Sequence, residues 1–279
     1  MSIIKLHSGR DVLRARLDIG KRSDGFLVCH GFSGSMHEPE ESAVMKDLAG
    51  MGYTVMIVSH ATGRRPDLIF PEQVRQLVDA VTYLTEVVHV RRVHLFGISM
   101  GASNAVSAGA IDTRIASVAA SSGIADCKVW LQQRLGRDFD AFVSRVSRFE
   151  ALQLRRERHA GPLFEVSELL RIPSNADAPT GKVRGRIARV SAQTVRSLLT
   201  YRPILAVPGI RDKPVFFFHG TGDQLVSYEH TLQMYRVAEK PKYKLLIRGG
   251  DYGMILIDSV RKKILSTYLR WLRAANILS

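Results

Sequence analysis

The sequence VHLFGISMG spans residues 93–101. Its mostly apolar first half is typical of a strand that is buried on both faces, and residues 102–110, which are rich in alanine, are typical of a helix. A serine between two glycines at a strand-to-helix junction is held in a tight turn that exposes its hydroxyl group. The stretch therefore predicts a strand–turn–helix unit with Ser99 as a nucleophile at the turn.

Strand-like and helix-like segments alternate on both sides of this turn. The expected strands cover residues 25–29, 53–58, 93–96, 115–120, 214–218 and 243–247, after an N-terminal hairpin over residues 3–17. The expected helices cover residues 40–51, 71–88, 102–110, 228–238 and 257–274. Such alternation indicates βαβ units, so we expect an α/β fold with a mostly parallel central sheet flanked by helices.

The alternation is interrupted over residues 126–212, where segments with helical periodicity dominate. We interpret residues 1–125 and 213–279 as the core and residues 126–212 as an inserted helical lid. The insertion contains 16 Lys and Arg residues against nine Asp and Glu residues, so it carries about half of the net charge of +14. Within it, residues 173–185 have the composition of a loop.

The basic charge limits the classes of partner. A basic surface attracts anions such as nucleic acid, anionic lipid, coenzyme A or an acidic carrier protein, although the charge also serves solubility alone. The chain has no zinc-type Cys/His spacing, no RNP motif and no basic heptad region, so we expect no nucleic-acid partner. Assembly into a homo-oligomer is left open by the sequence.

The sequence contains no signal for a cofactor, a metal or a membrane span. There is no G-x-G-x-x-G after the first buried strand, no P-loop and no HExxH. Cys29 and Cys127 are far apart in sequence, so we interpret both as buried thiols. No apolar run approaches the roughly 20 residues that cross a bilayer, and charges interrupt the N-terminal segment where a signal peptide needs an apolar core. We therefore expect a cytoplasmic protein without cofactor or metal.

Two loops are placed to assist Ser99. The glycine-rich loop HGFS at residues 30–33 follows the first buried strand and could present the Phe32 amide to a developing oxyanion, with the Met100 amide as second donor. The alternative is a simple turn at the end of a strand, ordered by His30. Asp223, in HGTGD after a late strand, could orient a catalytic base or could cap the next helix.

Four segments together resemble the α/β-hydrolase superfamily: FLVCHGFSGSMHEPE (26–40), GISMG (97–101), HGTGDQLV (219–226) and GGDYG (249–253). The similarity is greatest to its branch of small bacterial esterases, feruloyl esterases and acylglycerol lipases, and it covers residues 20–125 and 213–275. The resemblance implies an α/β-hydrolase fold without cofactor. It also implies a serine hydrolase for an ester or thioester, with a nucleophile at Ser99, an acid at Asp223 and an oxyanion hole formed by the Phe32 and Met100 amides.

The chain departs from this family at Tyr252. Family members commonly read G-x-D-H-G in the last strand–helix loop, where the histidine is the general base, and here tyrosine stands in its place. A tyrosine, with an ordinary pKa near 10, is a poor base at neutral pH. The last histidine of the chain is His230, so a shift of a few residues cannot supply the base. The loop at residues 59–65 also departs from the family pattern and contains His60, a conceivable substitute base.

Three explanations fit Tyr252. The base of an active hydrolase has been replaced, or the base was lost and left a ligand-binding or cyclase-like protein, or Tyr252 donates a proton in a non-hydrolytic reaction. The primary hypothesis is a serine hydrolase for a carboxylic ester or thioester, impaired by Tyr252, with an anionic or carrier-bound acyl substrate. A non-catalytic binding protein and an acyltransferase, cyclase or lyase remain as alternatives.

Overall fold

The computed structural model describes residues 1–60, 67–155, 163–171 and 187–278. Eight strands form one sheet in the order β1-β2-β4-β3-β5-β6-β9-β10. The N-terminal hairpin pairs antiparallel, β2 runs antiparallel to β4, and every other neighbouring pair is parallel. The strands are β1 (Ser2–Ser8), β2 (Asp11–Asp18), β3 (Asp24–Cys29), β4 (Thr54–Ser59), β5 (Arg92–Ile98), β6 (Ile115–Ser121), β9 (Val215–Gly220) and β10 (Lys242–Ile247).

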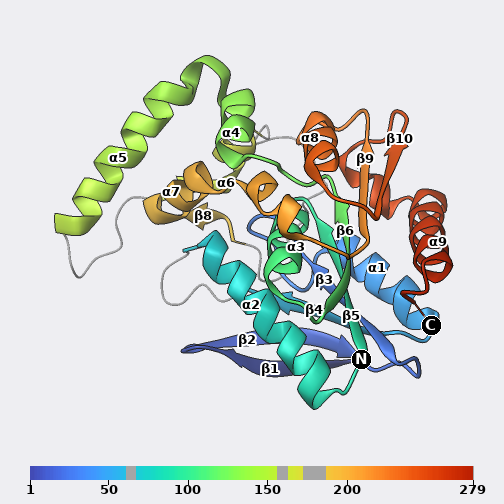
Figure 1. Ribbon diagram of the computed structural model, residues 1–279. Helices are drawn as coiled ribbons and strands as arrows, with labels where there is room; N and C mark the ends of the chain where they lie inside the picture. Colours follow the sequence, from blue (N-terminus) through green and yellow to red (C-terminus); the bar gives the residue numbers. More distant parts are fainter. Residues whose placement is uncertain (61–66, 156–162, 172–186, 279) are drawn as a thin grey trace.

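Helices cover both faces of this sheet (Figure 1). On one face lie α1 (Pro39–Gly50) and α9 (Asp258–Ala274), which share a buried apolar cluster with the strands. On the other lie α2 (Phe70–Thr82), α3 (Met100–Ile111) and α8 (Glu229–Val237). The mostly parallel sheet flanked by helices is therefore confirmed, and the helix expected at residues 71–88 ends in a π-helical turn, η1 (Tyr83–Val87).

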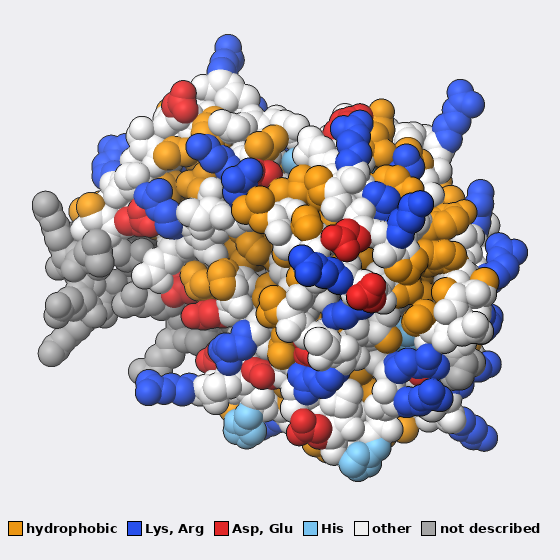
Figure 2. Space-filling model, in the orientation of Figure 1, with side chains coloured by type: hydrophobic (Ala, Val, Ile, Leu, Met, Phe, Trp, Pro, Cys, Tyr) orange, Lys and Arg blue, Asp and Glu red, His pale blue; other side chains and the backbone are white. Residues whose placement is uncertain are grey.

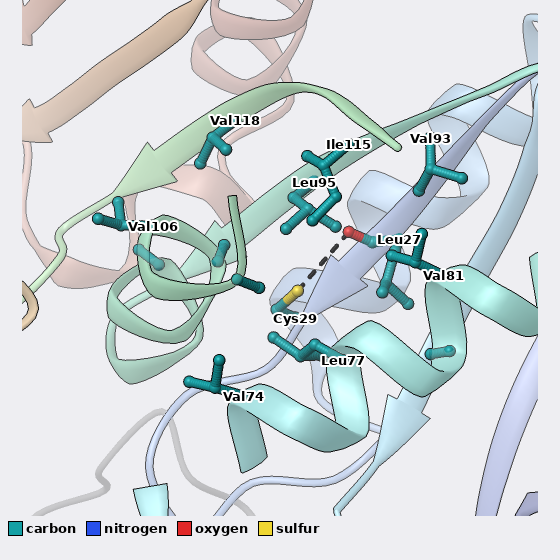
Figure 3. Close-up of a cluster of buried hydrophobic side chains, with 14 of the residues drawn as sticks. Leu27, Cys29, Val74, Leu77, Val81, Val93, Leu95, Val106, Ile115 and Val118 are labelled. Carbon is teal, nitrogen blue, oxygen red and sulfur yellow. Dashed lines mark hydrogen bonds between the residues drawn. The ribbon is translucent and has the colours of Figure 1, made fainter. Parts of the chain in front are cut away.

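The central strands are apolar throughout because both of their faces are covered. Along β5, Val93 and Leu95 point towards α2 and α3, whereas Phe96 and Ile98 point towards α1 and α9. Figure 3 shows the first of these clusters, in which Leu27 and Cys29 of β3 meet side chains of α2 and α3. Both cysteines, Cys29 and Cys127, are free and buried.

Most of the described residues between β6 and β9 form a further layer, whereas Val207 and Ile210 pack in the core cluster beside α3. The elements of this segment are α4 (Cys127–Leu135), η2 (Gly136–Asp138), α5 (Phe139–Arg155), β7 (Phe164–Glu165), α6 (Val166–Leu170), β8 (Arg189–Val190), α7 (Ala192–Thr200), η3 (Pro203–Leu205) and η4 (Val207–Gly209). In Figure 1, α5 extends away from the other helices. The apolar cluster of this layer includes Met100 and touches Phe32, so the layer packs beside the turn that follows β5. The loop expected at residues 173–185 lies outside the described residues.

The face seen in Figure 2 carries its charges in a dispersed pattern. Figure 2 shows Lys and Arg side chains spread over the visible face, with Asp and Glu among them. Among the described helices, none combines the length and the apolar character needed to cross a bilayer.

Candidate active site

Ser99 occupies the turn between β5 and α3, as the sequence predicts. Its backbone has φ 56° and ψ −124°, a conformation that residues other than glycine rarely adopt. The turn is fixed from both sides, because the Ser99 amide donates to Ser121 O at 2.8 Å and the Ser99 carbonyl accepts from Ala102 at 2.9 Å. Strain that the surrounding structure maintains in this way is common at reactive residues.

The two glycines that flank Ser99 permit close contact between backbones. A Cβ on Gly101 would lie 2.1 Å from the Cys29 carbonyl oxygen, and a Cβ on Gly97 would lie 2.4 Å from the Gly101 oxygen. Real Cβ atoms do not approach backbone this closely, so α3 can begin against the end of β3 only with glycine at residue 101. This packing brings Ser99 next to the loop that follows β3.

The loop after β3 forms a turn whose first residue faces Ser99. Gly34 N donates to Gly31 O at 3.1 Å. A Cβ on Gly31 would be 3.3 Å from both the Ser99 Cβ and the Tyr252 hydroxyl oxygen, which places those two side chains together. In the described part of the chain, the Phe32 amide has no hydrogen-bond acceptor. Met100 is the first residue of α3, so its amide has no acceptor within the helix either.

His30 and His60 pack against each other behind this loop. His30 Nδ1 contacts Gly31 O at 2.9 Å, His60 Nδ1 contacts Gln76 Oε1 at 2.9 Å, and the ring centroids are 4.9 Å apart. Burial, reinforced by the neighbouring His30, lowers the pKa of His60 to about 3. His60 is therefore a very weak proton acceptor. The rest of the altered loop, from residue 61, lies outside the described residues.

Asp223 is held in place after β9 by contacts on both carboxylate oxygens. The amides of Leu225 and Val226 donate to Oδ1 at 2.8 and 2.9 Å, and His219 Nε2 lies 3.2 Å from Oδ2. His219 Nδ1 in turn contacts Thr231 Oγ1 at 2.8 Å. The two amide contacts have the form of a turn or cap, and the same fixed carboxylate is also suited to orienting a base.

Helix α4 supports this acidic turn. The Trp130 indole donates to Leu225 O at 3.0 Å, and Arg134 Nη1 donates to Gln224 O at 2.6 Å. Gln133 Oε1 lies 3.1 Å from His230 Nε2 on α8. Two side chains of α4 thus attach the layer between β6 and β9 to the loop of Asp223, and a third attaches it to α8.

Tyr252 begins η5 (Tyr252–Leu256), a short 3₁₀ helix after β10. Its loop is held against the loop of Asp223, since Gly222 N donates to Gly250 O at 2.8 Å and a Cβ on Gly220 would lie 2.1 Å from that oxygen. Burial raises the pKa of Tyr252 above its ordinary value, while a hydrogen bond with the Ser99 side chain acts in the opposite direction. The structure therefore brings Ser99, the HGFS loop and Tyr252 together, with Asp223 on the adjoining loop.

Glu41 is a buried carboxyl group that the sequence reasoning missed. Burial, and then the neighbouring Glu40, raise the pKa of Glu41 well above its usual range, while a hydrogen bond from the Gly31 amide lowers it. The charge of Glu41 also raises the pKa of Tyr252, so this carboxyl lies near the candidate site. The signal was available, because Glu41 shares helical spacing with three buried residues of α1: Val44, Met45 and Leu48.

We expect Glu41→Gln to stabilise the protein increasingly as pH rises. In the unfolded chain Glu41 loses its proton above about pH 4.3, whereas in the folded protein it keeps it to a higher pH. Stability from this group is therefore complete below the unfolded pKa and is lost as pH rises towards the folded pKa. Each pKa unit between the folded and unfolded values corresponds to about 1.4 kcal/mol of stability lost at high pH. Glutamine, which has no charge to bury, would restore that stability. Urea unfolding at pH 5, 6, 7 and 8 measures the effect.

Glu72→Gln is the matched control for this substitution. Glu72 also lies in the first turn of its helix, α2, but it is exposed. Because its side chain is exposed, its substitution should change the free energy of unfolding far less than Glu41→Gln does. A pH-independent effect of Glu41→Gln would show that burial and the neighbouring carboxylates of Glu40 and Glu38 do not raise the pKa of Glu41 as proposed.

The described residues include no group of three His, Cys, Asp or Glu side chains that could hold a metal ion. The arrangement instead has the parts of a nucleophilic site: a strained serine, two amides beside it and a fixed carboxylate on the adjoining loop. Its departure from a complete triad is the phenol at residue 252.

Comparison with known proteins identifies the fold. No curated protein sequence matches the chain. Among solved structures, DcsB in complex with its substrate analogue has 16% identity, 96% coverage of both chains and a TM-score of 0.80. The α/β hydrolase GrgF from Penicillium sp. sh18 has 18% identity, 98% coverage of both chains and a TM-score of 0.80. Est1E from Butyrivibrio proteoclasticus has 20% identity, with 96% of this chain and 99% of that chain covered and a TM-score of 0.66.

At these identities the structural similarity establishes the fold. The sequence itself matches a family model described as alpha/beta hydrolase fold over residues 25–258. That match includes the turn of Ser99, the loop of Asp223 and the position of Tyr252. The chain belongs to the α/β-hydrolase family.

Proposed function

We propose that this protein is a serine hydrolase that acts on a carboxylic ester or thioester through an acyl-enzyme at Ser99, and that Tyr252 slows it. The observation that carries the proposal is the strained backbone of Ser99 at the start of α3, beside two amides that can receive an oxyanion. The relatives support the class, since GrgF is named an α/β hydrolase and another solved structure of Est1E holds ferulic acid.

In this mechanism Ser99 Oγ attacks the acyl carbon. The carbonyl oxygen becomes negative and is stabilised by the Phe32 and Met100 amides, the second of which lies at the positive end of the α3 dipole. The base at residue 252 accepts the serine proton and passes it to the leaving alcohol or thiol. Where the base is a histidine, Asp223 stabilises the imidazolium that forms. Water then attacks the acyl-enzyme, with the same base accepting its proton and the same amides stabilising the oxyanion.

Tyr252 weakens the step that needs a base. A phenol accepts the serine proton only as phenolate, and burial makes the phenolate rarer by raising the pKa of Tyr252. The oxyanion amides do not depend on that residue. Since such amides and binding alone can leave roughly a thousandfold acceleration over water, we expect slow acylation rather than none.

The proposed substrate class rests on the charge of the inserted residues and on their position beside Ser99. The inserted residues 126–212, which carry about half of the net positive charge, are proposed to act as a lid over Ser99. An acyl group on an anionic or carrier-bound partner would be attracted to this surface. Comparing a neutral ester with its carboxylated analogue at low and high salt distinguishes such attraction from simple solubility.

Labelling with a fluorophosphonate tests the proposal. Intact mass should show one adduct per chain on Ser99, formed slowly with Tyr252 and much faster in Tyr252→His, and no adduct in Ser99→Ala. If neither the natural chain nor Tyr252→His is labelled, Ser99 is not a nucleophile and the proposal fails.

The neutral hydroxyl of Tyr252 beside Ser99 also fits the alternatives to hydrolysis. A proton donor at that position suits a ligand-binding protein, or an acyltransferase, cyclase or lyase, better than it suits hydrolysis. Product analysis separates these functions from hydrolysis, because a binding protein releases no product and a cyclase or lyase releases no free acid.

A further inference from the structure

Arg261 of α9 is a nearly buried arginine with contacts to three elements. It is 6% exposed. Its Nε donates to Asp47 Oδ2 of α1 at 2.8 Å, and its Nη1 donates to Ile255 O at 3.1 Å and to Leu256 O at 3.3 Å. Its Nη2 also pairs with the Asp258 carboxylate. A buried guanidinium with this many partners fixes the relative position of the elements that supply them.

Two of these acceptors are the last carbonyls of η5, the helix that begins at Tyr252. A short 3₁₀ helix leaves its final carbonyls without partners of its own, so they must find donors elsewhere. Met254 and Ile255, each 1% exposed, anchor the same turn in the core. Arg261 thus completes η5 at one end, while Tyr252 stands at the other.

The third element, α1, connects Arg261 to the opposite side of the site. Helix α1 begins shortly after the loop of Gly31 and Phe32, and it lies beside α9 in Figure 1. Asp47 joins α1 to Arg261, and its side chain is 16% exposed. The guanidinium therefore connects the helix that follows the oxyanion loop to the helix that carries residue 252.

We propose that Arg261 is a positioning residue that sets the side chain at residue 252 against Ser99 by holding η5 to α1. The inference rests on the proposed function, because the catalytic consequence requires Ser99 to react. Lysine cannot replace this group, since one ammonium cannot reach a carboxylate and two carbonyls in the fork geometry of a guanidinium.

The experiment uses Tyr252→His as parent, with Arg261→Lys and Arg261→Ala added to it. Arg273→Lys is the control on the same helix, because Arg273 is exposed and donates to the hydroxyl of the buried Tyr53 at 3.1 Å. We expect kcat for an ester to fall roughly tenfold or more in Arg261→Lys with KM little changed, as a misplaced base predicts. The control should keep kcat. Free guanidinium should restore part of the activity of Arg261→Ala.

Hydrogen exchange reports on the same contact without needing activity. The amides of Met254 and Ile257 donate to Asp251 O at 3.3 Å and Met254 O at 3.1 Å, so they report on the opening of η5. They should exchange faster in Arg261→Lys than in Arg273→Lys, at a temperature where both variants are folded. Equal exchange in the two variants, or equal kcat, overturns the inference. If the parent is not labelled at Ser99, the proposed function fails, and exchange alone decides whether Arg261 holds η5.

Discussion

Tyr252→His is expected to raise ester turnover by roughly a hundredfold or more, the usual contribution of a general base. Histidine has an ordinary pKa near 6.5, so much of it can accept a proton at neutral pH, whereas burial raises the pKa of Tyr252. The other parts of the site are in place. Residue 252 lies next to Ser99 beside Gly31, and Asp223 is fixed on the adjoining loop. Initial rates on short and long acyl p-nitrophenyl esters measure the gain.

The pH dependence identifies the new base. In Tyr252→His, kcat/KM should rise as the imidazole loses its proton. Burial at residue 252 moves the midpoint below about pH 6.5, and the neighbouring carboxylate of Asp223 acts in the opposite direction by favouring the protonated form. Asp223→Asn in the same background should lower the midpoint and the rate. Tyr252→Phe removes the hydroxyl without adding a base and should stay slow. A gain that persists in Ser99→Ala would contradict the mechanism.

The turn of Ser99 was predictable because its determinants are local. Strand, glycine, serine, glycine and helix follow one another in the chain, and each constrains the next through backbone geometry. Met100 is the next residue after Ser99, so its position is local too. The loop of Phe32 is distant in sequence but predictable for another reason, because the neighbouring parallel strands β3 and β5 end at the same edge of the sheet. Periodicity therefore carried enough information for the sheet and for this part of the site.

Glu41 and Arg261 were not predicted because their environments are assembled from distant parts of the chain. The acceptors of Arg261 include Asp47, which is 214 residues away in sequence. Glu41 is buried, accepts a hydrogen bond from the Gly31 amide and lies near Tyr252, and no local pattern reports the distance between those segments. A charged residue on a helix is usually solvated. A buried role such as that of Glu41 or Arg261 can be recognised only when the position of the element packed against the helix is known.

Gly101→Ala is expected to lower the free energy of unfolding by about 3 kcal/mol or more, which is large for the addition of one methyl group. The new Cβ would lie 2.1 Å from the Cys29 carbonyl oxygen and 2.6 Å from that of His30. Both atoms belong to the backbone at the end of β3, so no side-chain rotation relieves the clash, and α3 must move away from the sheet. Urea denaturation followed by circular dichroism measures the loss.

Gly50→Ala separates this steric effect from the general effect of replacing glycine. Gly50 ends α1, and a Cβ there would meet nothing within 4 Å. Alanine at that position should raise stability by about 0.5–1 kcal/mol, since glycine is the poorer helix former. Moving α3 also displaces Ser99 and the Met100 amide, so Gly101→Ala in the Tyr252→His background should lose most of its fluorophosphonate labelling while Gly50→Ala keeps it. Full labelling in a folded Gly101→Ala variant would mean that the close contact between α3 and β3 is not what positions the nucleophile.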